Sequence, residues 1–164
     1  MDGSALMESL ENFYIKSVKG KSHWEVFHAT ACVYALIERQ TAGCLKPFNL
    51  TPVKFNALML IKHQGQAHGL SQNEICHHLI VSPSNITRLL DRLTKEGLIT
   101  RSAQANDRRV NLVKITKKGS ILLDRAWPSY CDMVKASSKS LNQNELNQLS
   151  VLLLKWFAEL EAGS

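Results

Sequence analysis

Apolar residues recur along most of the chain at the three- and four-residue spacing of an α-helix. In the first clear stretch, 22–46, Val26, Val33 and Ile37 fall on one side of a predicted helix. In a later stretch, 83–96, four apolar residues at i, i+3, i+4 and i+7 form one stripe: Ile86, Leu89, Leu90 and Leu93. The stripe at 83–96 marks the side of that helix that packs against the rest of the protein.

Polar residues that favour helix N-termini predict two more helices between these stretches. Thr51 precedes Pro52, and proline suits the first position of a helix because that position needs no N–H donor. We expect this helix to end in the polar run 63–69. Ser71 and Glu74 have the spacing of a capping box, in which each side chain accepts a hydrogen bond from the other residue's backbone. A short helix should therefore begin there.

A β-hairpin and a long helix should follow the stripe at 83–96. The short runs 98–102 and 110–115 are rich in β-branched residues and flank a polar turn, which predicts two paired strands. Thr116 is placed to cap a helix that extends to about residue 139. Pro128 lies inside that helix and should kink or divide it, because proline cannot donate the backbone hydrogen bond.

The two ends of the chain are apolar on more than one side of their predicted helices. The apolar residues are Leu6, Met7, Leu10, Phe13, Tyr14, Ile15 and Val18 at the first end, and Leu149, Val151, Leu152, Leu153, Leu154, Trp156, Phe157 and Leu160 at the second. A helix that is hydrophobic nearly all round must be buried. Burial against a second copy predicts a homodimer, since two-fold contacts are the commonest in oligomers. Packing beneath the chain's own core is the alternative.

Composition favours a folded protein of the cytoplasm. The 164 residues suffice for one domain, or one domain with dimerisation segments. The first residues lack the basic run and apolar core of a signal peptide, and no apolar run approaches the ~18 residues that span a bilayer. No membrane partner is therefore expected. The four cysteines form no C-x-x-C motif, which favours small buried side chains over disulfides.

Positive charge is concentrated in one segment. The chain has 20 Lys and Arg against 14 Asp and Glu, a net charge of +6. Residues 82–118 hold nine of the basic residues and three of the acidic ones, so this segment alone accounts for the net charge. The nine are Arg88, Arg92, Lys95, Arg101, Arg108, Arg109, Lys114, Lys117 and Lys118. A basic excess confined to one segment indicates a surface that binds a polyanion.

The same segment has the spacing of a helix-turn-helix. A short capped helix at 71–79 is followed by a short turn and a second helix at 83–96, which Gly97 ends. Opposite its apolar stripe the second helix carries Ser84, Thr87, Arg88, Asp91 and Lys95, with Asn85 and Arg92 beside them. Such a face suits the major groove of DNA. Arginine can read guanine there and asparagine adenine, while serine, threonine and lysine reach phosphates.

The polar turn between the two predicted strands holds Asp107, Arg108 and Arg109. A β-wing beside a recognition helix can place its tip over the minor groove, where a narrow groove concentrates negative potential and favours a guanidinium. We expect one arginine to point along this groove and the other toward a phosphate. Asp107 is interpreted as a clamp that pairs with Arg101 or a backbone N–H and fixes the turn.

Residues of about 50–119 resemble the MarR-type winged helix-turn-helix regulators. The matching segments, in order, are "LTPVKFNAL", "LSQNEICHHLIVSPSNITRLLDRLTKEGLITR", "DRRV" and "ITKKG". The resemblance implies a mainly α-helical fold with a small β-hairpin wing. It makes 47–119 the DNA-binding lobe and 1–46 with 120–164 the intertwined dimerisation helices. It also implies that Arg109 enters the minor groove, and that the phosphate and base contacts come from Ser82, Ser84, Asn85, Thr87 and Arg88.

The resemblance further implies a homodimeric repressor that binds a pseudo-palindromic site in double-stranded DNA and is released by a small effector. Members of this family usually hold small aromatic or phenolic compounds in a cleft between the dimer helices and the DNA-binding lobe. Six residues could line such a cleft here, or could be ordinary core: Trp24, Phe27, His28, Tyr34, Met59 and Trp127. No cofactor is expected.

Three alternatives stay open: a DNA-binding regulator without ligand control, a metal sensor and a thiol sensor. Zinc-binding members of the MarR family use histidine and acidic groups on their first and fifth helices, and the predicted fifth helix here, 117–139, has no histidine. Peroxide-sensing relatives carry a cysteine near the start of the first long helix, where this sequence aligns Phe27, with Cys32 five residues later. An enzyme is not expected, since G-x-S-x-G, H-E-x-x-H and phosphate-loop motifs are absent.

Overall fold

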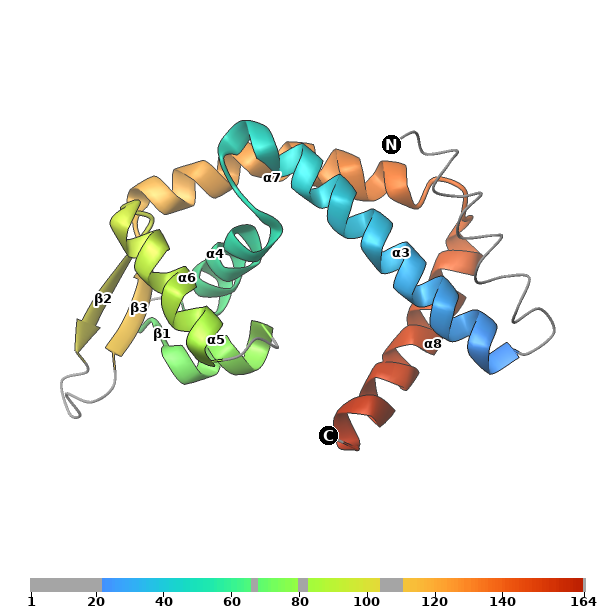
Figure 1. Ribbon diagram of the computed structural model, residues 1–164. Helices are drawn as coiled ribbons and strands as arrows, with labels where there is room; N and C mark the ends of the chain where they lie inside the picture. Colours follow the sequence, from blue (N-terminus) through green and yellow to red (C-terminus); the bar gives the residue numbers. More distant parts are fainter. Residues whose placement is uncertain (1–21, 66–67, 80–82, 104–110, 164) are drawn as a thin grey trace.

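The protein is mainly α-helical, with one small sheet, in the computed structural model, which describes residues 22–65, 68–79, 83–103 and 111–163. The elements in chain order are α3 (Ser22–Leu45), the 3₁₀ helix η2 (Lys46–Phe48), α4 (Pro52–Gln64), β1 (Leu70–Ser71), α5 (Gln72–Leu79), α6 (Pro83–Lys95), β2 (Ile99–Ala103), β3 (Asn111–Ile115), α7 (Lys117–Ser137) and α8 (Gln143–Ala162). This confirms the predicted fold class, a winged helix-turn-helix with long flanking helices (Figure 1).

Side-chain caps begin the helices where the sequence predicted them. The Thr51 hydroxyl accepts a hydrogen bond from the Lys54 N–H at 3.3 Å, and Pro52 follows at the first helical position. Ser71 and Glu74 form the predicted capping box at the start of α5. The Ser71 N–H donates to Glu74 Oε2 at 2.7 Å, and the Glu74 N–H donates to Ser71 Oγ at 3.2 Å.

The long helix α7 is capped as expected, but it is not divided. Thr116 Oγ1 accepts from the Gly119 N–H at 3.0 Å and donates to the Gly97 carbonyl at 2.8 Å. The helix then runs through Pro128 without a break. Pro128 lies on an exposed part of α7, so water can satisfy the backbone carbonyl that loses its partner. A proline in such a position costs stability without ending the helix.

The sheet has one strand more than the sequence predicted. The expected hairpin is present as β2 and β3, which pair antiparallel with Ile99 opposite Ile115. The two-residue strand β1 pairs with the other edge of β3, with Leu70 opposite Val113, so the strand order is β1-β3-β2. The wing is therefore tied by hydrogen bonds to the segment just before α5.

A continuous apolar core lies beneath the wing and the helix-turn-helix. The predicted stripe of α6 faces it: Ile86, Leu90 and Leu93 are fully buried, and Leu89 is partly buried against the same cluster. The other buried apolar residues are Leu45, Leu50, Phe55, Ala57, Leu58, Ile61, Leu70, Ile75, Leu98, Ile99, Val113, Leu123 and Ala126. Because α4, α5, α6, the sheet and the first half of α7 share this core, they form one packed lobe.

The remaining helices extend from this lobe as an arm. In Figure 1, α7 leaves the lobe, α3 runs back toward it alongside, and α8 turns downward from the far end of α7. No residue of α8 is buried within the chain. Its exposed large apolar side chains are Leu149, Val151, Leu152, Leu153, Leu154, Phe157 and Leu160. Such a helix needs a further surface to cover it.

We expect Gly119→Ala to destabilise the protein by about 1–3 kcal/mol, the usual cost of overpacking a core. A Cβ at Gly119 would overlap the Leu98 carbonyl oxygen and would lie 3.0 Å from Ile115 Cγ1. Gly43 is the matched control, because a Cβ there meets nothing within 4 Å. Alanine in that helical position should stabilise the protein by about 0.5 kcal/mol. Thermal unfolding measures both, and equal melting temperatures for the two variants would contradict the close packing of α7 on Leu98 and Ile115.

A candidate nucleic-acid interface

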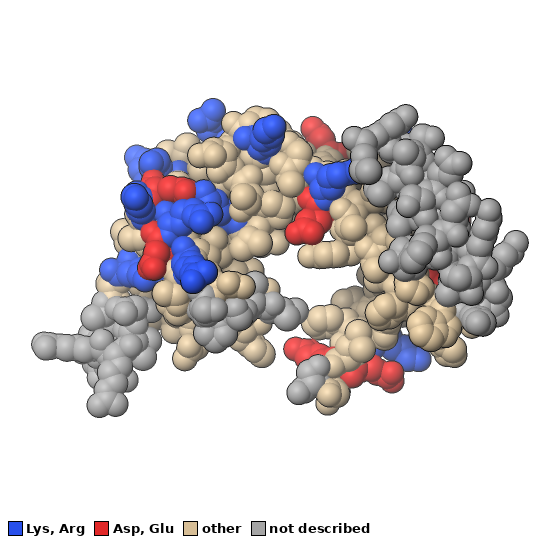
Figure 2. Space-filling view, in the orientation of Figure 1, with Lys and Arg blue, Asp and Glu red and all other residues tan. Residues whose placement is uncertain are grey.

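The exposed side of α6 carries polar and cationic side chains opposite its buried leucines. Asn85, Arg88, Arg92 and Lys95 are exposed. Figure 2 shows lysine and arginine side chains gathered on the lobe that carries α6, with a few acidic side chains among them. The helix is therefore held from beneath by apolar contacts while its outer side stays free for a polar partner. This is the arrangement expected for a helix that enters the major groove of DNA.

Thr87, predicted as a member of the same polar face, is partly buried and joins α6 to α5. Its hydroxyl accepts a hydrogen bond from Gln72 Nε2 at 2.8 Å. Glu74, two residues after Gln72, caps the start of α5 with its carboxylate. Hydrogen bonds from the side chain and the backbone of Ser71 lower the pKa of this carboxyl group. Polar bonds therefore fix the start of α5 as well as its separation from α6.

Arg101, on β2, reaches across to α6. Its Nη1 lies 2.9 Å from Asp91 Oδ1, and its Nη2 donates to the Thr87 carbonyl at 3.4 Å. Its Nε is buried and has no hydrogen-bond partner among the described residues. Asp107, the predicted partner of Arg101, lies outside the described residues. Within them, the carboxylate that pairs with Arg101 is Asp91, on the face that also carries Arg88.

The C-terminal end of α6 is held by two lysines. Lys54 Nζ lies 2.6 Å from Glu96 Oε1, and the Lys54 side chain is only 7% exposed. Lys118 Nζ donates to the Glu96 carbonyl at 2.7 Å, where a cation also suits the negative end of the helix dipole. Lys54 further borders a hollow that it shares with Lys46 and Arg92. Sequence reasoning missed the contact of Lys54 with Glu96, because it depends on how α4 and α6 meet.

Several residues of the predicted site cannot be placed. Ser82, Asp107, Arg108 and Arg109 lie outside the described residues, as does the side chain of Ser84. The predicted contacts of these residues therefore stay predictions. The residues predicted for this surface that are described on it are Asn85, Thr87, Arg88, Arg92, Lys95 and Arg101.

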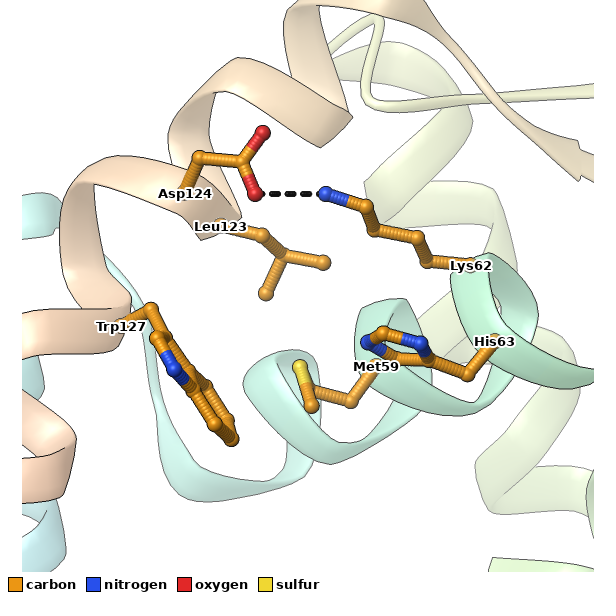
Figure 3. Close-up of a pocket in the computed structure, with 6 residues that line it drawn as sticks. All are labelled: Met59, Lys62, His63, Leu123, Asp124 and Trp127. Carbon is orange, nitrogen blue, oxygen red and sulfur yellow. Dashed lines mark hydrogen bonds and ion pairs between the residues drawn. The ribbon is translucent and has the colours of Figure 1, made fainter.

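A pocket of about 420 Å³ lies between α4 and α7, on the side of the lobe that meets the arm. Met59, Lys62 and His63 from α4 face Leu123, Asp124 and Trp127 from α7 across it (Figure 3). Lys62 Nζ and Asp124 Oδ1 form an ion pair at 2.6 Å that joins the two helices at one edge of the pocket. An indole ring, a thioether and a leucine offer apolar contact to a small aromatic molecule.

The six side chains predicted to line an effector cleft fall into two groups. Met59 and Trp127 line the pocket between α4 and α7. Trp24, Phe27, His28 and Tyr34 do not line it; they lie on α3, where Trp24 stacks on His28 with ring centroids 6.1 Å apart. The sequence did not distinguish the groups, because the spacing along α3 does not show which of its turns reaches the lobe.

Residues that could hold a metal ion are not gathered in the described part of the chain. No group of three or more His, Cys, Asp or Glu side chains is placed there to hold a metal ion. The four cysteines are partly buried, and burial raises the pKa of the Cys44 thiol above its usual range. A thiol with a raised pKa stays protonated at neutral pH and reacts slowly with oxidants. Among the described helices, none has both the length and the hydropathy of a membrane-crossing segment.

Comparison with known proteins agrees with this geometry. Residues 50–110 match the model of the MarR family. The HTH-type transcriptional regulator YhbI of Bacillus subtilis is 27% identical over 128 residues, which are 78% of this chain and 81% of that protein. A MarR mutant from E. coli complexed with operator DNA matches with a TM-score of 0.76 and 24% identity, over 87% of this chain and 96% of that one. CouR from Rhodococcus jostii, bound to p-coumaroyl-CoA, matches with a TM-score of 0.70 and 24% identity, over 79% of this chain and 89% of that one.

Proposed function

We infer that this chain, whose winged helix-turn-helix belongs to the MarR family of transcription regulators, binds a pseudo-palindromic site in double-stranded DNA as a homodimer and represses transcription. The observation that carries the inference is the exposed row of Asn85, Arg88, Arg92 and Lys95 on α6, a helix whose opposite side packs into the apolar core. A related fold has been crystallised on operator DNA. A repressor bound to DNA of the chromosome acts in the cytoplasm.

The proposed DNA contacts divide into base-reading and phosphate-binding side chains. Arg88 and Asn85 lie toward the N-terminal half of α6, the part of a recognition helix that reaches the base edges. Arg92 and Lys95 lie nearer its C-terminal end and suit backbone phosphates. Ser82, Ser84 and Thr87 complete the helix-turn-helix contacts. We assign the minor-groove contact of the wing to Arg109 and a phosphate contact to Arg108.

The proposed dimer joins the two lobes through the arms. Residues 1–46 and 120–164 form the dimerisation part, and 47–119 form the DNA-binding lobe. The uncovered apolar side chains of α8 support this division, because a matching helix from a second copy would remove them from water. Two lobes related by a two-fold axis would then bind two half-sites related in the same way.

We further propose that the pocket between α4 and α7 takes a small aromatic or phenolic effector that releases the DNA. α4 contacts both α7, which lines the other side of the pocket, and the end of α6, the proposed DNA-reading helix. Lys62 ties it to α7 across the pocket, and Lys54 ties it to the end of α6. A ligand that fits one separation of α4 and α7 better than another would shift α6 with α4, and so change the spacing of the two recognition helices.

One experiment tests the regulator and its effector in sequence. DNA fragments that the protein retains are selected from a random library, and their affinity is compared with that of unselected DNA. A panel of phenolic compounds, metal ions and oxidants is then added to the complex. We expect a phenolic compound to release the DNA and to quench the fluorescence of Trp127, which lines the pocket, with Trp127→Phe removing that part of the signal.

The outcomes separate the candidate regulators. No enrichment of any fragment would contradict the proposed function. Release by peroxide that a thiol reductant reverses would favour the thiol sensor, and release by a metal ion alone would favour the metal sensor. Enrichment without release by any compound would leave a DNA-binding regulator without ligand control.

A further inference from the structure

A chain of polar contacts joins the three elements that would face DNA. Gln72 on α5 donates to the Thr87 hydroxyl on α6 at 2.8 Å. Arg101 on β2 donates to the Thr87 carbonyl at 3.4 Å and pairs with Asp91 at 2.9 Å. Thr87 and Asp91 are four residues apart and so lie on adjacent turns of α6. One guanidinium therefore contacts two successive turns of the recognition helix from the strand that leads into the wing.

The charges in this chain of contacts do not suit a simple DNA-binding face. Asp91 is an acid on a cationic face, and its side chain is 61% exposed. Arg101, the cation that could bind a phosphate, is 25% exposed and its Nε is buried. A guanidinium that is already paired with a carboxylate and partly buried is poorly placed to bind a DNA phosphate. Its planar fork, which presents several N–H donors in fixed directions, suits the joining of two acceptors.

We propose that Arg101 is a positioning residue of the DNA-binding surface: by holding Asp91 and the Thr87 carbonyl together, it fixes the wing strand β2 against α6. The distance between the base-reading helix and the wing is then set before DNA is bound. We call the contacts of Arg101 with Asp91 and with the Thr87 carbonyl the Arg101 brace. The same ion pair offsets the negative charge of Asp91. This inference rests on the proposed function, because it assigns the orientation of the two elements that would read one half-site.

The test compares four variants with the intact full-length protein on a selected DNA site and on random DNA. Arg101→Lys keeps the charge but loses the fork, Arg101→Gln loses both, and Asp91→Asn removes the acid. Lys117→Gln is the matched control, because Lys117 is exposed at the start of α7 and its loss removes one positive charge from the same lobe. Affinity is measured over a range of salt concentrations, below the temperature at which any variant begins to unfold.

The brace predicts a loss of selectivity with little change in the dependence on salt. Arg101→Gln should lower the ratio of specific to random affinity about ten-fold, within the range of coupling between contacting residues, and Arg101→Lys should lower it less. Asp91→Asn should weaken specific binding although it removes a negative charge. The double variant Arg101→Gln, Asp91→Asn should lose no more than the worse single variant, because both act through one contact.

Other results would overturn the brace. A fall of about one unit in the slope of log affinity against log salt for Arg101→Gln, matching that of a phosphate contact, would make Arg101 a direct DNA ligand. Tighter specific binding by Asp91→Asn, or additive losses in the double variant, would also contradict it. If no DNA site can be selected at all, the proposed function fails. Amide hydrogen exchange then tests the brace alone, and unchanged protection of β2 in Arg101→Gln would reject it.

Discussion

Replacing Val151 and Leu154 with glutamate should leave the chain monomeric and lower its affinity for a two-half-site DNA by about 10²- to 10⁴-fold, the gain that linking two binding modules provides. The side chains of both residues are more than half exposed in the chain, at 66% and 64%, and lie three residues apart on one side of α8. Charged groups there would have to be buried in any dimer that covers α8. Sedimentation at micromolar concentration and titration of a selected DNA site measure the two effects.

Two glutamates at Gln143 and Asn144 provide the control for this pair. Both positions are exposed in the first turn of α8, so the variant adds the same charge away from the apolar side chains and near the favourable end of the helix dipole. It should remain dimeric and bind DNA almost as the unmodified protein does. A double variant at Val151 and Leu154 that still sediments as a dimer would contradict dimerisation through this helix, as would an unmodified chain that is a soluble monomer.

Arg88→Ala is expected to cost about 1–3 kcal/mol on a selected DNA site, which is about 5- to 150-fold in affinity, and much less on random DNA. Arg88 is exposed on α6 and carries no hydrogen bond or ion pair within the described part of the chain. Its guanidinium is therefore free to pair with the two acceptors of a guanine edge. Fluorescence anisotropy on both DNAs at one salt concentration gives the comparison.

Arg125→Ala is the matched control for Arg88→Ala. Arg125 is also an exposed arginine, but it lies on α7, away from the recognition helix. Its loss removes the same charge, so the affinity for the selected site and the affinity for random DNA should fall slightly and by the same factor. If Arg88→Ala instead reduces the two affinities by the same factor, Arg88 is a phosphate contact and the base reading must be assigned to other residues of α6.

The parts of the fold that the sequence predicted are those fixed by neighbours along the chain. A helix cap needs residues three apart, so the roles of Thr51, Ser71 with Glu74, and Thr116 were readable as patterns. The start of α8 has the same local form, a capping box of Asn142 and Glu145. The apolar stripe of α6 also depends only on spacing along the chain, and the structure confirms that this side of the helix packs into the core. Of the two effects predicted for Pro128, a kink or a division, the division is wrong, because the pattern did not show that its part of α7 faces solvent.

The contacts that the sequence did not reveal join residues far apart. Lys54 and Glu96 are separated by 42 residues, and either could have been a solvated surface charge. The strand β1 has only two residues, too few for an alternating pattern, and exists because β3 offers it an edge. The pairing of Asp107 with Arg101 or a backbone N–H stays a prediction, and the contact of Arg101 with Asp91 on α6 was not predicted. Charge and spacing identify candidates for such pairs, but packing selects among them.

The absence of a buried residue in α8 also bears on how the cell must supply this protein. Under the proposed dimer, a newly made chain keeps its apolar side chains in water until it meets another. Below the dissociation constant of the dimer, the amount of paired protein rises with the square of the total, so a two-fold change in synthesis gives about a four-fold change in the DNA-binding form. Scarce chains would also be exposed to proteases, which makes the response of a promoter to gene dosage steeper still.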